Sequence, residues 1–352
     1  MKKRLDWVDI FKGLAILSVV IGHSGSFLTS YVYLFHLPAF IFISGYTFNY
    51  KKYKNFQDLV YEKFRRLIIP YFSFAFFFSF FQILLKYLRL NTVFYSTNTP
   101  EIFNPFWLFN SITSINYTNQ LSGATWFLVM LFETIIFSYL LLVIQNKFRI
   151  KDFILVIFTI ILLIFGCLLL YPRWPVTHVN YFLDLNFVSI VFFISGFLFK
   201  KYKIFLKVNN IFYIAVSIIL ILFSKMFIYR QMDFPSRTFD SWYKVLVFAF
   251  TGIILLYFIS KFIEKIRLLR NVFIHIGKKT LLILCLHFFG FKIAFYILFI
   301  LGLYKFKNLL LLTPPPSNFL WILIVFISLV TSIVVSKIIS SNKFTRAIFL
   351  GE

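Results

Sequence analysis

The sequence is poor in acidic residues and in charge altogether. Of its 352 residues only 12 are Asp or Glu, and 14% are charged, against about 25% in soluble domains. Hydrophobic residues make up 61% of the chain, with 53 Phe among them. This composition argues against a water-soluble fold and indicates an integral, multi-pass protein that contacts membrane lipid.

Cysteine is scarcer still, with two residues in the chain. Cys167 and Cys285 both lie in apolar stretches, which argues against a disulfide framework and against a cysteine metal centre. The intramembrane histidines lack short ligand spacing, so no metal site is expected. The net charge of +24 does not indicate a nucleic-acid partner, because the cations interrupt apolar runs and form no single basic face.

Apolar stretches of about 20 residues, the length that crosses a bilayer, recur along the whole chain. They predict an all-α polytopic membrane protein, with about ten transmembrane helices in one bundle and a single membrane-embedded domain over residues 1–352. The first stretch lacks a small-residue cleavage site and is expected to stay as a helix. The ninth is long enough to predict a kink or break near Gly290. The ten predicted spans are 10–29, 31–49, 68–88, 124–145, 153–170, 181–199, 209–229, 245–262, 274–301 and 319–338.

The distribution of cations orients these spans. With the N-terminus in the cytoplasm, 26 of the 36 Lys and Arg fall on the cytoplasmic side, as the positive-inside rule requires. Both termini are therefore predicted to be cytoplasmic. The outer segments 91–123, 171–180 and 230–243 mix aromatic and polar residues, which suits carbohydrate contacts and equally an interfacial aromatic belt.

Two segments repeat each other. Residues 42–48 and 193–199 share Phe-Ile-Ser-Gly, and each precedes Lys-Lys-Tyr-Lys. A duplicated half is one reading. We favour another, in which each small Ser-Gly pair permits close helix packing at a crowded helix end.

Polar residues inside the apolar spans are the candidates for function. Lys12 and His23 stand eleven positions apart, which on a helix places them on one face about 16 Å apart. A snorkelling lysine and a histidine that only bonds a neighbouring helix would explain the pair without function. His36, His287, Glu133 and Asp184 also fall in or beside spans, and so many ionisable groups in lipid indicate a functional site.

Three classes of protein can use such groups. Buried His and carboxylate side chains serve as proton relays in transporters and glycan flippases. Histidine is also the side chain best suited to act as a base near neutral pH, as an enzyme requires. A purely structural membrane protein would leave the intramembrane histidines unexplained. The residues alone do not separate enzyme from transporter.

Five motifs in order resemble the acyltransferase 3 family of membrane proteins. Lys12 and His23 are similar to its R/K-x10-H motif, with Lys where Arg is common. The other four are Phe35 to Tyr46, with His36 and Pro38; Arg65 and Arg66 before Pro70-Tyr71; Trp126-Phe127-Leu128 with Glu133; and Gly277-Lys278 through His287. The resemblance covers most of the chain. It implies about ten helices, a cytoplasmic acyl-CoA donor, and transfer of an acyl group, commonly acetyl, to a sugar hydroxyl of a cell-surface or exported glycan. The acceptor is expected to be a carbohydrate or a lipid-linked glycan, and the expected location is the bacterial plasma membrane.

The residues can be assigned roles on this basis. His23 is the candidate general base, with His36 and His287 as candidates to assist. Glu133, Asp9 or Asp184 could orient an imidazole. Lys12, Arg65, Arg66 and Lys278 are expected to bind the phosphates of acetyl-CoA. The alternative stays open at this point: a glycan or small-solute transporter with an intramembrane His and carboxylate proton relay.

Overall fold

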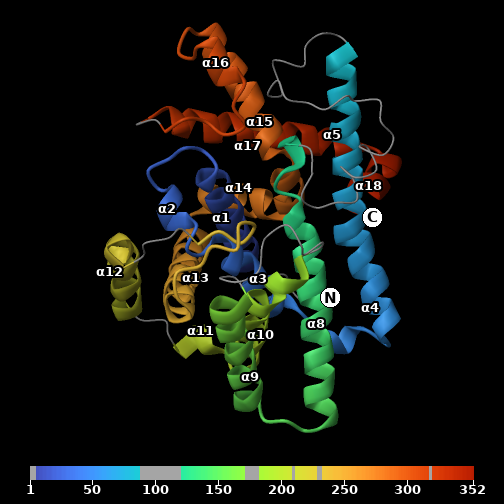
Figure 1. Cartoon of the computed structure of the whole chain (residues 1–352), viewed down its shortest axis with the longest axis vertical. Helices are drawn as coiled ribbons and strands as arrows, with labels where there is room; N and C mark the ends of the chain where they lie inside the picture. The colour runs from blue at the N-terminus through green and yellow to red at the C-terminus, as the bar shows by residue number, and fades with distance from the viewer. Residues whose placement is uncertain (1–4, 88–119, 171–181, 208–210, 228–231, 317–318) are drawn as a thin grey trace. The chain divides into compact units, whose positions relative to one another are not determined.

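A computed structural model describes residues 5–87, 120–170, 182–207, 211–227, 232–316 and 319–352. Within these ranges the chain is helical, and no strand occurs beyond an isolated bridge between Asp233 and Thr238 (Figure 1). Helices satisfy their backbone hydrogen bonds internally, as lipid demands of a spanning segment. The predicted all-α fold class is confirmed. The outer segments 91–123 and 171–180 lie mostly or wholly outside the described residues.

Six helical segments of the described chain are long and apolar enough to cross a membrane. They correspond to the third, fourth, sixth, eighth, ninth and tenth predicted spans. They are Phe56–Leu85 (α4, Phe56–Lys63, a π-helical turn at Phe64–Ile68, and most of α5, Ile69–Tyr87), α8 (Trp126–Lys147), Leu183–Lys201 (containing α10, Asn186–Lys201), α13 (Trp242–Glu264), α15 (Thr280–Ile300) and α17 (Leu320–Ser341).

The other predicted spans correspond to shorter helices. These are α1 (Asp6–Gly22), α3 (His36–Thr47), α9 (Asp152–Phe165) and α12 (Ile211–Phe227). The second predicted span, 31–49, is therefore too long: α3 begins at His36, which puts Pro38 in the first turn, where a missing N–H costs little. The count of ten helices and the cytoplasmic termini stay predictions.

The ninth predicted span, 274–301, is broken, but not at Gly290. The break falls at Lys279, between α14 (Arg267–Lys278) and α15. Gly290 lies inside α15, where a Cβ would approach the Oγ of Ser328 on α17 to 2.7 Å. Gly290 thus permits close packing of α15 on α17 rather than a kink.

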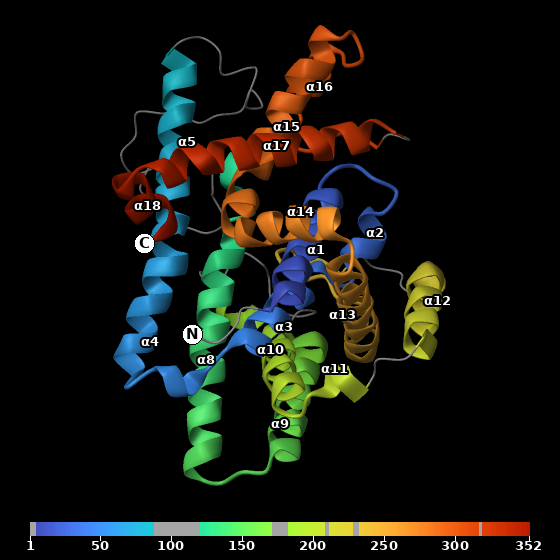
Figure 2. The ribbon, with the colours of Figure 1, turned by 180° about the vertical axis from the view of Figure 1, so that it is seen from behind.

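The described chain forms two compact units, each assembled from separate segments. The first contains residues 1–19, 30–60 and 130–278, and the second contains 20–29, 61–129 and 279–352. In the first unit α3 packs along α10, and α13 contacts α3, α12 and α14; α12 lies beside α13 in both views (Figures 1 and 2). In the second unit α15 packs on α17, and the C-terminal α18 (Lys343–Leu350) packs on α5 and α17.

The two Phe-Ile-Ser-Gly segments pack against each other across the contact between α3 and α10. A Cβ on Gly45 would lie 1.9 Å from the carbonyl oxygen of Phe193, and one on Gly196 would lie 2.0 Å from that of Phe42. The contact is thus reciprocal, with each glycine facing the phenylalanine that begins the other motif. Close packing through the small pairs, the favoured explanation of the repeat, is confirmed.

Enlarging Gly45 is expected to break this contact. Gly45→Leu forces side-chain atoms into a backbone carbonyl and should lower the free energy of unfolding by about 3 kcal/mol. Thr47→Leu is the matched control, because Thr47 is exposed on the same helix. Thermal unfolding in detergent measures both variants. Equal stability of the Gly45 and Thr47 variants would contradict the packing account.

Candidate functional site

Two imidazole rings meet in the second unit. His23 lies in the turn after α1, and His287 lies within α15. Their ring centroids are 5.5 Å apart and the ring planes differ by 24°. Two of the three predicted intramembrane histidines are therefore neighbours, although they come from opposite ends of the chain.

His23 is not on the helix, as the sequence predicted, but just beyond its end. α1 stops at Gly22 because the Oγ of Ser24 donates to the carbonyl of Ile21 over 2.8 Å, and Gly25 takes a left-handed φ of 67°. Gly25 also allows the turn to approach Pro314, since a Cβ there would be 2.6 Å from the Pro314 carbonyl oxygen. The short turn thus holds His23, which is half-buried.

His287 has a defined tautomer. Its side chain is fully buried, and its Nδ1 lies 2.8 Å from the carbonyl oxygen of Leu284 and 3.2 Å from that of Ile283. Carbonyls only accept, so Nδ1 must donate, and in the neutral ring Nε2 then carries a lone pair. Among the described residues Nε2 has no hydrogen-bond partner. An acceptor nitrogen without a partner beside a second imidazole is suited to proton chemistry.

Aromatic rings surround the histidine pair. The ring of Phe288 lies 5.1 Å from that of His23 and 4.3 Å from that of His287, and Phe291 meets His287 edge-on at 5.8 Å. Apolar rings limit the access of water, which strengthens the electrostatic interactions of any group bound there.

His36 belongs to the first unit. It is buried, and its Nδ1 lies 2.8 Å from the carbonyl oxygen of Val32. Its ring meets that of Tyr33 edge-on at 4.8 Å. Val32 ends the short helix α2 (Thr29–Val32) and His36 begins α3, so the bond to Val32 joins the two helix ends and gives His36 a local structural role. Among the described residues, no group of three or more His, Cys, Asp and Glu could hold a metal ion.

Glu133 joins a polar network between α8 and α10. Asn186 donates from Nδ2 to Glu133 over 3.1 Å, and Thr134 donates to the Oδ1 of Asn186 over 2.9 Å. The hydroxyls of Thr134 and Ser189 are 2.7 Å apart. The network lies in the first unit and links two apolar helices through polar side chains, each of which has at least one partner.

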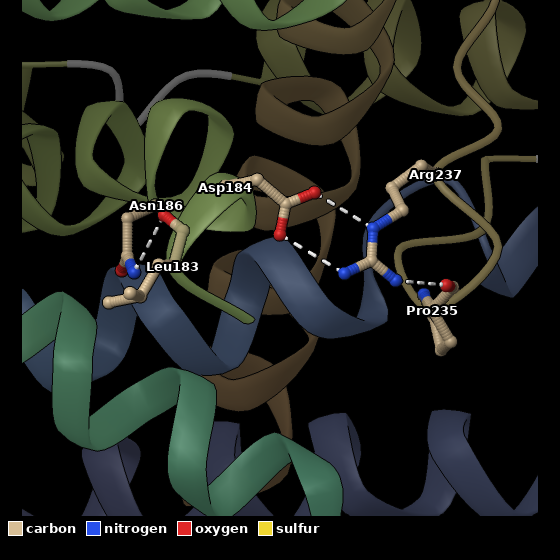
Figure 3. A network of polar contacts seen from close by, with 5 residues as sticks. All are labelled: Leu183, Asp184, Asn186, Pro235 and Arg237. Carbon is tan, nitrogen blue, oxygen red and sulfur yellow. Dashed lines mark hydrogen bonds and ion pairs between the residues drawn. The ribbon is translucent and has the colours of Figure 1, made fainter. Parts of the chain in front are cut away.

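Asp184 pairs with Arg237 in the same unit. The guanidinium donates from Nε over 2.8 Å and from Nη2 over 3.0 Å to the two carboxylate oxygens, and from Nη1 to the carbonyl of Pro235 (Figure 3). The two side chains are only 6% and 12% exposed. Sequence reasoning treated Asp184 as a possible partner for an imidazole and gave Arg237 no role. Nothing local in the sequence joins them, because they meet only through tertiary packing.

The predicted phosphate-binding cations divide between the units. Lys12 lines a cavity of about 260 Å³ with Asp9, Tyr46 and Lys200, while Lys278, exposed at the end of α14, does not line that cavity. Lys200 is a cation that the prediction did not include.

Arg65 and Arg66 lie in the second unit, in the π-helical turn Phe64–Ile68. Arg65 faces the ring of Tyr61 at 5.8 Å, and exposed Arg66 is 4.0 Å from Glu62. Gly351 packs on this turn, since a Cβ there would meet the Arg65 carbonyl at 1.7 Å. Single π-helical turns are frequent at functional sites, which keeps these arginines among the candidates.

The Asp184–Arg237 pair should be costly to break. Arg237→Ala leaves a buried carboxylate without its partner and is expected to lower the free energy of unfolding by about 3–5 kcal/mol. Replacing both residues, as Asp184→Leu with Arg237→Met, should restore most of the loss, because no charge is then left buried. Thermal unfolding in detergent tests this. If the double variant is no more stable than Arg237→Ala, the loss of stability does not come from the unpaired carboxylate of Asp184.

Comparison with known proteins identifies the family. A family model described as an acyltransferase domain matches residues 5–340 of the 352. Neither the curated proteins nor the solved structures give a match. The matched region includes every residue of the histidine pair, the polar network and the Lys12 cavity. Because the match covers almost the whole chain, and the described residues contain six helices that are long and apolar enough to cross a membrane, this protein belongs to the acyltransferase 3 family and is an integral multi-pass membrane acyltransferase.

Proposed function

We propose that this protein transfers an acetyl group from acetyl-CoA on the cytoplasmic side of the bacterial plasma membrane to a sugar hydroxyl of a cell-surface or lipid-linked glycan. Family membership supports the acyl transfer. The observation that carries the chemistry is the His23–His287 pair, with an available acceptor nitrogen on His287. Acyl transfer to a hydroxyl requires a neutral base in a site with little water, and this histidine pair can supply one.

His23 is the base in this proposal because it is the more accessible of the two rings. An imidazole nitrogen of His23 takes the proton of the acceptor hydroxyl as its oxygen attacks the thioester carbonyl carbon. The carbon–sulfur bond then breaks, and the departing CoA sulfur receives that proton. The products are the sugar ester and free CoA, and His23 returns to its neutral form.

His287 is a positioning residue for that step. Its Nδ1–H is held by two carbonyls of its own helix, so the ring keeps one orientation against His23 and, when neutral, has its lone pair on Nε2. A neutral ring with a lone pair stabilises the imidazolium that His23 becomes during transfer. A protonated His287 would instead repel the imidazolium of His23 and disfavour its formation.

The acyl donor is proposed to bind beside Lys12. CoA carries several negative charges at its nucleotide end, and the Lys12 cavity also contains Lys200. An ammonium interacts with phosphate as a point charge, whereas a guanidinium binds it through two parallel hydrogen bonds. The acceptor is proposed to be a glycan from the family resemblance and from the aromatic and polar outer segments.

Substitution of the two histidines tests the roles. His23→Gln should abolish transfer of acetyl from acetyl-CoA, because no base remains. His287→Phe keeps the ring against His23 but removes Nε2, and should lower kcat about 10- to 100-fold with an unchanged KM for acetyl-CoA. Turnover by purified, folded variants is measured by mass spectrometry of the acetylated glycan. Near-normal turnover of His23→Gln would reject the base, and a raised KM in His287→Phe would indicate a binding role instead.

Substitution of Lys12 tests the donor and separates enzyme from transporter. Lys12→Ala should weaken acetyl-CoA binding about tenfold, the scale of one charge-assisted contact. Lys12→Arg should keep most of the affinity, because the charge persists. Calorimetry measures binding, and thermal unfolding shows whether α1 is intact. If the folded wild-type protein binds no acetyl-CoA at any salt concentration, the donor site is wrong, and the proton-relay transporter becomes the better explanation.

A further inference from the structure

The first unit contains a larger cavity that the proposed roles do not use. It measures about 530 Å³ and lies where the C-terminal ends of α3, α8 and α10 meet the start of α9. All four helix ends are on the side predicted to be cytoplasmic. The volume is within the range of small-molecule sites, roughly 300–1,000 Å³.

The walls of this cavity carry an excess of positive charge. Four cations line it, Lys51, Arg149, Lys200 and Lys201, against one carboxylate, Asp152. No other acidic side chain lines it within the part of the chain that the structure describes. A concave surface with this charge attracts anions and concentrates them.

Asp152 forms an ion pair with Lys201 in the wall of the cavity. The Nζ of Lys201 lies 2.5 Å from the Asp152 carboxylate, and Gln145 donates to the same group over 2.6 Å. The hydroxyl of Tyr202 donates to it as well. Burial raises the pKa of the Asp152 carboxyl, but these hydrogen bonds outweigh burial and hold the pKa below its ordinary value. The carboxylate therefore stays charged and keeps Lys201 in place.

Arg149 occupies a position where glycine is usual. Its N–H bonds the carbonyl of Asn146 over 3.4 Å, and the N–H of Ile150 bonds that of Gln145 over 2.9 Å. This is the hydrogen-bond pattern of a Schellman helix end, whose left-handed residue is most often Gly. Here that residue is Arg149, with φ 52°. A left-handed backbone is costly for a residue with a side chain, and at Arg149 it occurs in the wall of the cavity.

The remaining walls suit an organic group. Asn49, Asn146 and Gln145 line the cavity with amides, which offer both donors and acceptors. The rings of Tyr50 and Phe197, 5.9 Å apart, also line it. Aromatic faces with amides beside cations can hold a base and its phosphates together.

The cavity shares one lining residue with the Lys12 cavity. Lys200 lines both. The two cavities therefore have a common wall at Lys200, and a ligand longer than either cavity could contact both Arg149 and Lys12.

We infer that the cavity around Arg149 binds the adenosine 3′,5′-bisphosphate portion of the acyl donor, and that Lys12 contacts the donor further along its length. The inference rests on the proposed function for the identity of the donor. The shared chemistry is that of phosphate, so the headgroup of an anionic lipid is the competing source of the same charge.

The test compares two variants with matched backbone effects. Arg149→Gly removes one cation from the cavity and relieves a left-handed backbone. Lys203→Gly does the same at φ 52° on an exposed residue that does not line the cavity. Both variants should melt no lower than wild type. Calorimetry with adenosine 3′,5′-bisphosphate should show about tenfold weaker binding to Arg149→Gly and unchanged binding to Lys203→Gly.

Each result decides between the alternatives. Equal binding to both variants, or no binding to wild type, overturns the inference; if acetyl transfer from acetyl-CoA is still observed, the proposed function stands without it. Arg149-dependent binding in a protein that transfers no acetyl group supports the cavity and rejects the function. The same calorimetry is repeated with the protein in lipid nanodiscs. If adenosine 3′,5′-bisphosphate binds in nanodiscs of zwitterionic lipid but not in nanodiscs of phosphatidylglycerol, the cavity is assigned to an anionic lipid headgroup and the inference of a nucleotide site is overturned.

Discussion

Polar side chains in this protein bond mainly to the carbonyls of their own helices, and much of the structure depends on that constraint. Hydrocarbon offers no water, so a buried hydroxyl or ring N–H needs a protein acceptor. Ser18 donates to Leu14, Ser44 to Phe40 and Thr251 to Val247, each over four residues. The helices can therefore contain polar residues without partners on other helices, and they pack through shape instead.

The same constraint prepares the proposed chemistry. The Nδ1 of His287 is committed to the carbonyls of Ile283 and Leu284, and this commitment leaves Nε2 as an acceptor beside His23. An imidazole with one nitrogen fixed by backbone has a defined tautomer and orientation, which a base or its partner requires. The α-helix thus supplies, through its own carbonyls, the orienting group that a carboxylate supplies in many soluble enzymes. Glu133 and Asp184 have other partners in the structure, Asn186 and Arg237.

Charge in the first unit is concentrated at helix ends. Lys51, Arg149, Lys200 and Lys201 surround one cavity at the ends of α3, α8 and α10, where cations also interact favourably with the negative ends of the helix dipoles. Positive charge placed there by the rules of membrane insertion can serve a second purpose in binding an anionic substrate. Arg149 shares its left-handed backbone with Lys203, and what distinguishes it is its place in the wall of the cavity.

The sequence by itself determined the all-α class, six of the long apolar helices, the family, the close contact of the two Ser-Gly motifs, and a set of intramembrane residues that contains both members of the histidine pair. These follow from local signals: length, composition, spacing and motif. It did not determine that His23 leaves the helix, that Asp184 meets Arg237, or that Arg149 and Lys200 line a cavity. Only the tertiary structure decided these, because a helix that is apolar on every side has no distinct polar and apolar faces from which its orientation could be predicted. Their neighbours and rotations are set by close packing, such as that at Gly45 and Gly196.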